Sequence, residues 1–376
     1  MATIDPAHLT FALRTHERLR ELPRDGDLLW SPYSVAAALA MVAAGARGRT
    51  RDELDRYLAP GGSLDDLLDR VRAGAAPDTD AAAPDASGVA VANTLWAQQA
   101  LPIVPAYEGL MRGMPGGAVR NADFHRDPGG AAGMINDDVA KTTRGLIREI
   151  VDANAVADAD AVLVNALWVF VAWRERFAVR ETRPRTFHAP GGDRQVPMMC
   201  AQRRMAYAEA AGWRMATVSG HGGLAMDVLL PDRPLSEAPP RPDDLAELYA
   251  AAREREVRLT LPRFEVEYGT ELRPVVGGLG VPTMFAGDAD LTGISPARLS
   301  VDKILHKARL RVDEAGAEGA AATAVVMKLS MAVQKHPPVD LTADRPFLIA
   351  VRHSSSGLLY FLAELTTPTD PGPAKD

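Results

Sequence analysis

The sequence predicts a single-domain α+β fold. Apolar residues at helical spacing lie mostly before residue 160, and short apolar runs typical of strands follow it. The two kinds of segment do not alternate regularly, and no Pro/Gly-rich linker separates them. The chain has 376 residues, 47% of them hydrophobic, which is enough for a large core. We therefore predict one domain over residues 1–376.

Three helices are predicted in the first part of the chain. Leucines recur at helical spacing over residues 6–21, between Arg and Glu side chains. A second helix begins at Ser31, which can cap the free backbone donors, and Pro32 suits its first turn. A third is predicted over residues 135–152, with a stop near Gly145.

Residues 161–173 form the most apolar segment and predict a strand buried on both faces, because the run is too short to span a bilayer. The Ala/Pro/Asp-rich residues 74–88 predict a surface loop, and residues 369–376 predict a flexible tail. Further strands are predicted at RTFHA, VPMMC, RMAYAEA, LAMDVLLP, VRLTLPRFEVEY, FLIAVRH and LLYFLAEL.

Composition excludes several classes of function. The net charge of -7 and the absence of a Lys/Arg block argue against nucleic-acid and membrane partners. The eight histidines are scattered and no metal-binding or phosphate-binding motif occurs, so we expect no metal and no cofactor. The single cysteine, Cys200, has apolar neighbours and is interpreted as an inert strand residue. The start of the chain lacks a secretory signal, which favours a cytoplasmic or leaderless protein.

One segment resembles an enzyme motif. VSGHGGLAM contains Ser219, His221, Gly222 and Gly223, similar to the HGG element of lipase oxyanion holes. No G-x-S-x-G nucleophile elbow accompanies it. A Gly-rich hairpin turn is the favoured interpretation, and a hydrolase using Ser219 and His221 is kept as an alternative.

The segment DEAGAEGAAATAVVMKLSM, residues 313–331, is poor in large side chains but alternates with period two. Small or apolar residues occupy one phase, beginning at Ala317, and Glu318 lies on the other. The pattern predicts a linker that is also able to become a strand with one buried face.

Several segments in order resemble the serpin family from about residue 7 to residue 368. They are SPYSVAAALAMVAAGARGRTRDEL, INDDVAKTTRGLIREIV, LVNALWVFVAWRERF, LTLPRFEVEYGTELRPVVGGLGVPTMF, DLTGIS, KILHKARLRVDEAGAEGAAATA and DRPFLIAVRHSSSGLLYFLAEL. The resemblance implies three sheets, eight or nine helices and a metastable monomer with a reactive loop at residues 314–338. It also implies a suicide inhibitor: a serine protease cleaves the loop, which inserts into the main sheet and traps the acyl-enzyme. The Ala/Arg/Gly/Pro-rich composition without a disulfide indicates a bacterial member.

Insertion requires small, uncharged side chains on the inward phase, since an unpaired charge there costs several kcal/mol. The matching hinge residues meet this requirement, with Gly316 as a pivot and Glu318 on the outward phase. The hinge comprises Glu314, Gly316, Ala317, Glu318, Gly319, Ala320, Ala321, Ala322 and Thr323. These properties favour an inhibitor over the alternative, a non-inhibitory serpin that acts as a binding or chaperone protein.

The resemblance places the scissile bond by counting from the hinge glutamate, which puts Ser330 at the acyl position and Met331 after it. A loop one or two residues shorter would select Leu329 or Lys328. These choices imply elastase- or subtilisin-like, chymotrypsin-like and trypsin-like targets, respectively.

Other residues match family positions where the main sheet opens. Ser31, Ser34, Asn165 and His306 match the polar cluster beneath the opening, and Trp173 matches the aromatic residue at its top, near Gly316. Simpler roles stay open: Ser31 as a helix cap and His306 as a core histidine.

Overall fold

The protein is described by a computed structural model covering residues 4–24, 26–76, 78, 87–317 and 337–372. Within these ranges it has nine α-helices, two 3-10 helices and fifteen strands, which confirms the α+β fold and the expected number of helices. The helices are α1 (Pro6–Arg20), α2 (Pro32–Gly45), α3 (Gly48–Leu58), α4 (Leu64–Ala73), α5 (Pro105–Arg112), α6 (Pro128–Thr142), α7 (Ala153–Val156), η1 (Val179–Glu181), α8 (Pro242–Ala251), α9 (Arg273–Gly278) and η2 (Thr283–Phe285). The strands are β1 (Leu28–Trp30), β2 (Gly88–Gln98), β3 (Gly117–Ala122), β4 (Ala161–Ala172), β5 (Arg183–Ala189), β6 (Gly192–Ala210), β7 (Trp213–Ser219), β8 (Leu224–Pro231), β9 (Arg253–Pro262), β10 (Phe264–Glu271), β11 (Lys303–Val312), β12 (Gly316–Ala317), β13 (Val339–Thr342), β14 (Phe347–His353) and β15 (Leu359–Leu365).

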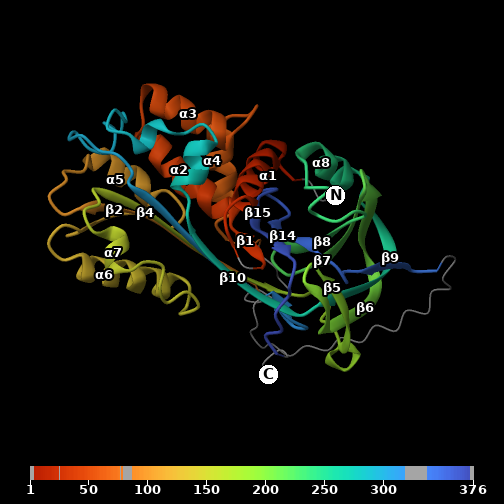
Figure 1. Ribbon diagram of the computed structural model, residues 1–376. Coiled ribbons are helices and arrows are strands. Elements are labelled where there is room, and N and C mark those ends of the chain that lie inside the picture. The colour runs from red at the N-terminus through yellow and green to blue at the C-terminus, as the bar shows by residue number, and fades with distance from the viewer. Residues whose placement is uncertain (1–3, 25, 77, 79–86, 318–336, 373–376) are drawn as a thin grey trace.

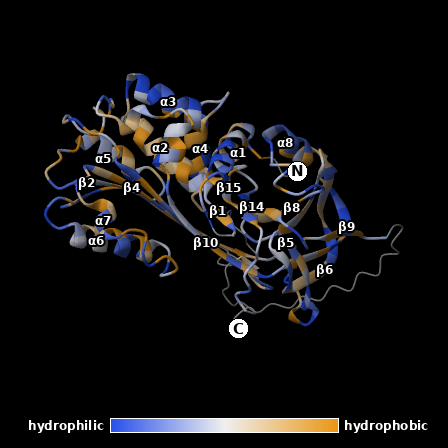
Figure 2. Ribbon diagram, viewed as in Figure 1, coloured by the Kyte–Doolittle hydropathy of each residue, from blue (hydrophilic) through white to orange (hydrophobic). Residues whose placement is uncertain are grey.

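The first two helices begin as the sequence predicts. Asp5 and Ser31 cap α1 and α2 by accepting a backbone N–H of the first turn, and a proline follows each cap. Every residue of α2 except Ala44 is buried, and Figure 2 shows hydrophobic colour along this helix. Its alanines allow neighbours to pack closely on all sides, so α2 forms the centre of the main core.

A six-stranded sheet has the order β10-β11-β12-β4-β2-β3. Helix α2 packs on one face, and α6 with α7 covers the other (Figure 1). Because side chains alternate along β4, Val162 and Val164 pack beneath α6 while Leu163 and Leu167 belong to the main core. Strand β4 is therefore buried on both faces, as predicted for residues 161–173.

A nine-stranded sheet has the order β1-β15-β14-β8-β7-β6-β9-β13, with β5 paired to the start of β6. The 19-residue strand β6 changes partners along its length. It pairs with β5 up to Met198, with β9 from there to Tyr207, and with β7 from Tyr207 to Ala210. The described chain therefore forms two hydrogen-bonded sheets where three were expected, because β6 joins β5, β9 and β7 in one network.

The structure also corrects the predicted positions of helices and strands. The helix predicted over residues 135–152 begins earlier, at Pro128, behind a cap by Asp127, and ends at Thr142. Strands β2 and β3 also lie before residue 160, where mostly helices were expected. Both strands are stabilised by pairing with sequence far along the chain, β2 with β4 and β3 with β2, which local patterns do not reveal.

The predicted surface loop 74–88 is described in part, and within it the amide of Asp78 donates to the turn between β7 and β8 at 2.8 Å. Of the predicted tail 369–376, residues up to 372 are described. Thr369 forms a β-bridge with Glu265 of β10, so this part of the tail lies at the edge of the six-stranded sheet.

Candidate functional site

The described part of the predicted hinge ends in the two-residue strand β12, which lies between the two central strands of the six-stranded sheet. Gly316 pairs antiparallel with Ala172 of β4. Ala317 lies between Val171 of β4 and Val312 of β11, is 1% exposed and belongs to the main core. The side chain of Ala317 therefore occupies the inner face of the sheet.

The strands on either side of β12 also pair directly with each other, further from the hinge. Residues 303–307 of β11 and 162–166 of β4 form a parallel ladder. Between this ladder and β12 lie residues 308–311 of β11 and 167–170 of β4. These intervening rows are the part of the sheet that a strand continuing from β12 would enter first.

Gly316 is required by space. A Cβ at this position would lie 2.4 Å from the Val171 carbonyl oxygen, much closer than a carbon can approach. Gly316 is not among the described glycines with a positive φ. From the sequence we predicted that Gly316 serves as a pivot. In the structure it instead allows the backbones of β12 and β4 to approach closely.

Asp313 and Trp173 hold the turn before β12. The Asp313 Oδ1 atom accepts the Ala315 N–H at 2.9 Å, and the Asp313 N–H donates to the Gly316 carbonyl at 3.0 Å. The indole Nε1 of Trp173 donates to the Asp313 carbonyl at 3.0 Å, and its backbone N–H donates to the Ala315 carbonyl at 3.2 Å. Trp173 thus lies beside the hinge.

The hinge glutamate, Glu314, is 1% exposed and has two partners. Its Oε1 accepts from the Thr182 hydroxyl at 2.7 Å and from Arg263 Nη1 at 3.3 Å. Arg263 Nη2 also donates to Asp370 in the C-terminal segment at 3.2 Å. A buried carboxylate needs such partners. Sequence reasoning missed both, because Thr182 and Arg263 lie 132 and 51 residues from Glu314.

The four polar residues predicted beneath the sheet opening form one buried hydrogen-bonded cluster. The Ser34 N–H donates to Ser31 Oγ at 3.1 Å, and Asn165 Nδ2 donates to the Ser34 carbonyl at 2.8 Å. Asn93 of β2 completes the cluster by accepting from Asn165 Nδ2 at 2.5 Å. Sequence reasoning missed Asn93; a lone amide in the apolar run VAVANTLW was its only signal.

His306 connects β11 to this cluster. Its Nε2 accepts the Ser31 N–H at 3.1 Å, so the proton lies on Nδ1, which is 2.9 Å from Asn165 Oδ1. Burial lowers the pKa of His306 to about 3. If Nε2 were also protonated, its N–H would point at the Ser31 N–H, and two donors would face each other. The neutral imidazole therefore links α2, β4 and β11 at a row where the two strands pair directly.

Comparisons with known proteins identify the family of this chain. The family model described as Serpin (serine protease inhibitor) matches residues 6–368. The chain belongs to the serpin family. Leukocyte elastase inhibitor from Sus scrofa is 30% identical and covers 98% of this chain and 100% of its own length. Two solved structures share the fold. Serpin48 of the insect Tenebrio molitor has a TM-score of 0.83, 23% identity and coverage of 97% and 98%, and thyroxine-binding globulin in complex with thyroxine has a TM-score of 0.82, 20% identity and coverage of 97% and 99%.

Residues 318–336 of the predicted reactive loop fall outside the described residues, which resume at residue 337 before β13. They include the predicted hinge and scissile-bond residues Glu318, Gly319, Ala320, Ala321, Ala322, Thr323, Lys328, Leu329, Ser330 and Met331. The assignment of the scissile bond stays a prediction.

The hydrolase alternative falls on a β-hairpin of the serpin fold. Ser219 ends β7, and Gly222 and Gly223 have φ values of 65° and 71° in the turn to β8. The nucleophile elbow of α/β-hydrolases needs a strand-to-helix turn, which differs from this strand-to-strand turn.

The single cysteine, Cys200, lies on strand β6, and the Thr260 hydroxyl donates to its sulfur at 3.7 Å.

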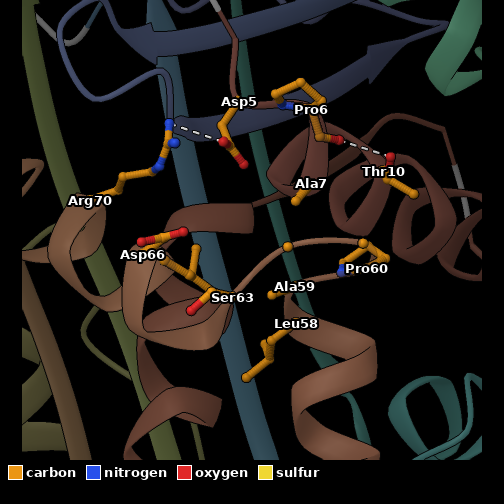
Figure 3. A pocket seen from close by; sticks show the side chains of 13 residues that line it. Asp5, Pro6, Ala7, Thr10, Leu58, Ala59, Pro60, Ser63, Asp66 and Arg70 are labelled. Carbon is orange, nitrogen blue, oxygen red and sulfur yellow. Dashed lines mark hydrogen bonds and ion pairs between the residues drawn. The ribbon is translucent and has the colours of Figure 1, made fainter.

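A surface cavity lies between the start of α1, the end of α3 and the start of α4 (Figure 3), and none of its lining residues belongs to the hinge. In this cavity the guanidinium of Arg70 pairs with the carboxylate of Asp5 at 2.9 Å, and the Thr10 hydroxyl donates to the Pro6 carbonyl.

In the described parts of the chain, no group of three or more His, Cys, Asp or Glu could hold a metal ion. No described helix is both long and apolar enough to cross a membrane.

Proposed function

We propose that this serpin is an irreversible suicide inhibitor of serine proteases. The observation that carries the proposal is β12: Gly316 and Ala317 already form the first residues of a strand between β4 and β11. A cleaved loop would continue this strand into the intervening rows. The attached protease would be carried along before its acyl-enzyme is hydrolysed.

The composition of the following residues supports the proposal. Continuing the alternation from Ala317 assigns Gly319, Ala321 and Thr323 to the inner face, where they add no charge and little volume. In the register of β12, Thr323 would reach the row of His306 and Asn165. Its hydroxyl could then replace part of the polar cluster that insertion has to open.

The favoured target is a protease of elastase or subtilisin type, cutting between Ser330 and Met331. The similarity to leukocyte elastase inhibitor from Sus scrofa supports an elastase-like target. Cleavage after Leu329 would indicate a chymotrypsin-like target, and cleavage after Lys328 a trypsin-like one.

Incubation with elastase-, subtilisin-, chymotrypsin- and trypsin-like proteases tests the function. We expect an SDS-resistant band at the summed mass of inhibitor and protease with at least one of them. Mass spectrometry of the released C-terminal peptide then identifies the scissile bond. If every protease cuts the loop and leaves fully active, the proposal is wrong.

A non-inhibitory serpin is the second candidate, and the similarity to thyroxine-binding globulin in complex with thyroxine favours it. Loop cleavage distinguishes the two candidates. An inhibitor should gain thermal stability after cleavage, since the inserted strand completes the sheet. A melting temperature that cleavage leaves unchanged would favour a binding protein.

A further inference from the structure

Residues 174–194 form a basic stretch in an acidic protein. They contain six arginines and three acidic residues, a net charge of +3, whereas the whole chain carries -7. The stretch follows β4 and contains η1 and β5. Arg183 and Arg185 on β5 are exposed, and neither pairs with a carboxylate of the described residues. Their charges are therefore available to a partner.

An exposed apolar side chain adjoins these arginines. Val179 on η1 is 57% exposed, and in the described chain only Leu110 and Met134 are large apolar residues of similar exposure. The Thr182 N–H donates to the Val179 carbonyl at 3.1 Å, so η1 turns directly into β5. The side chain of Arg180, next to Val179, is 82% exposed.

We call Val179, Arg180, Arg183 and Arg185 the arginine surface. Protein–protein interfaces combine apolar side chains at their centre with a polar rim, and arginine is enriched in them. The arginine surface has both components within seven consecutive residues.

The strand that carries the arginine surface is bonded to the segments on both sides of the predicted reactive loop. Before β5, the Thr182 hydroxyl donates to Glu314 Oε1 of the hinge at 2.7 Å. Near the other end of β5, the His188 N–H donates at 2.6 Å to the carbonyl of Asp344, two residues after β13. Strand β5 therefore runs from the segment before the loop to the segment after it.

A protease bound to the loop is large enough to reach this surface. The predicted bond between Ser330 and Met331 precedes Val339 of β13 by eight residues, which span at most about 30 Å. Strands β13, β9, β6 and β5 are successive neighbours in the sheet. A protease of about 230 residues has a radius of gyration of about 17 Å and is about 45 Å across. Its surface can therefore contact β5 while its active site holds the loop.

A simpler role accounts for part of the arginine surface. Strand β5 pairs only with β6, and charged residues and proline on such an edge strand prevent pairing with other chains. Arg183, Pro184 and Arg185 fit this role. Val179 and Arg180 do not, because they belong to η1 and lie outside the sheet.

We propose that the arginine surface is a docking site for an acidic surface of the target protease. Attraction between opposite charges raises the rate of encounter by about 10- to 1,000-fold. Among proteases that cut the same bond, the chain would therefore react fastest with those that are acidic around the active site. The inference rests on the proposed function, because it narrows the class of its target.

The test compares two proteases that cut the same bond of the loop, one acidic and one basic. We expect Arg183→Glu, Arg185→Glu to react at least about tenfold more slowly than the unmodified chain with the acidic protease at about 0.05 M NaCl. The difference should shrink at about 0.5 M NaCl, where charges are screened. With the basic protease, the double variant should react no more slowly than the unmodified chain.

The control is Arg56→Glu, Arg72→Glu, which makes the same change in net charge at exposed positions on α3 and α4, away from β5 in Figure 1. Its rate constant with the acidic protease should stay within about twofold of the unmodified chain. Equal slowing in the two double variants would assign the effect to net charge and overturn the inference. Aggregation of Arg183→Glu, Arg185→Glu with unchanged rates would also overturn it, because the arginines would then only protect the edge of β5.

A second variant keeps the inference testable if the double variant does not fold. Arg180→Glu changes only an exposed side chain outside the sheet and should slow the reaction in the same direction. The rate constant is measured both for trapping and for loop cleavage. A chain that is cleaved but never traps a protease would refute the inhibitory function, whereas the cleavage rates of the variants would still decide whether the arginine surface docks the protease.

Discussion

His306 on β11 donates through Nδ1 to Asn165 Oδ1 on β4 at 2.9 Å, in a row where the two strands pair directly. A strand inserted to this depth would separate the two residues by an additional strand spacing, so the bond has to break. Leaving a buried polar group without a partner costs about 1 to 3 kcal/mol. We therefore expect the polar cluster to oppose the insertion of a strand between β4 and β11.

The buried histidine predicts a pH dependence of stability. The unfolded chain binds a proton at this residue below about pH 6.5, whereas the folded-state pKa of His306 is about 3. The unfolded state thus binds more protons between these values, so the contribution of His306 to stability is complete above about pH 6.5 and declines as pH falls toward about 3, at up to about 1.4 kcal/mol per pH unit.

Urea unfolding at about pH 7.5 and about pH 5.5 measures this contribution. We expect the unmodified chain to lose about 1 kcal/mol more than His306→Gln, which cannot titrate. His125→Gln, at a half-exposed side chain, is the matched control and should behave like the unmodified chain. Equal losses in all three proteins would show that His306 is not the titrating group.

Arg263 predicts a large loss of stability when it is removed. Arg263→Ala leaves Glu314 buried without its cation, and breaking a buried pair in this way costs about 3 to 5 kcal/mol. The double variant Arg263→Ala, Glu314→Gln no longer carries the unpaired buried carboxylate, so part of the lost stability should be recovered. Thermal unfolding of both variants measures the difference; a double variant less stable than Arg263→Ala would contradict the pairing.

The contrast between Glu314 and Arg263 shows how far the sequence could predict this site. Glu314 was assigned because the chain around it resembles a known motif. Arg263 and Asn93 were missed because each meets its partner only after distant strands pair. Local signals were also misleading, since the glycines after Pro128 do not suggest the start of a helix. Gly130 nevertheless suits this turn, because a Cβ there would lie 2.2 Å from the capping carboxylate of Asp127, which would have to move.

Gly316→Ala should force β12 out of the sheet. The added methyl would meet the Val171 carbonyl, and overpacking of this kind costs about 1 to 3 kcal/mol. Amide exchange in residues 167–171 and 308–312 should therefore accelerate. Gly109→Ala is the control, because a Cβ there meets nothing within 4 Å and favours helix α5 by about 0.5 to 1 kcal/mol. Unchanged exchange in Gly316→Ala would mean that the hinge does not hold this part of the sheet together.

Ala317→Arg tests which face of the new strand is buried. Ala317 is 1% exposed between Val171 and Val312, so a guanidinium there would enter the core without a partner, at a cost of several kcal/mol. Loop cleavage should continue, while trapping of the protease should be lost and the inhibitor become a substrate.

The control is Glu318→Arg, one residue further on and on the outward phase of the alternation, where a charge can remain in water. The measurement is the number of inhibitor molecules consumed per protease inactivated. This ratio should rise at least about tenfold for Ala317→Arg and stay within about twofold for Glu318→Arg, because only the first charge has to be desolvated. Equal ratios for the two variants would show that burial of the inward phase does not limit insertion, and a higher ratio for Glu318→Arg would reverse the assigned faces.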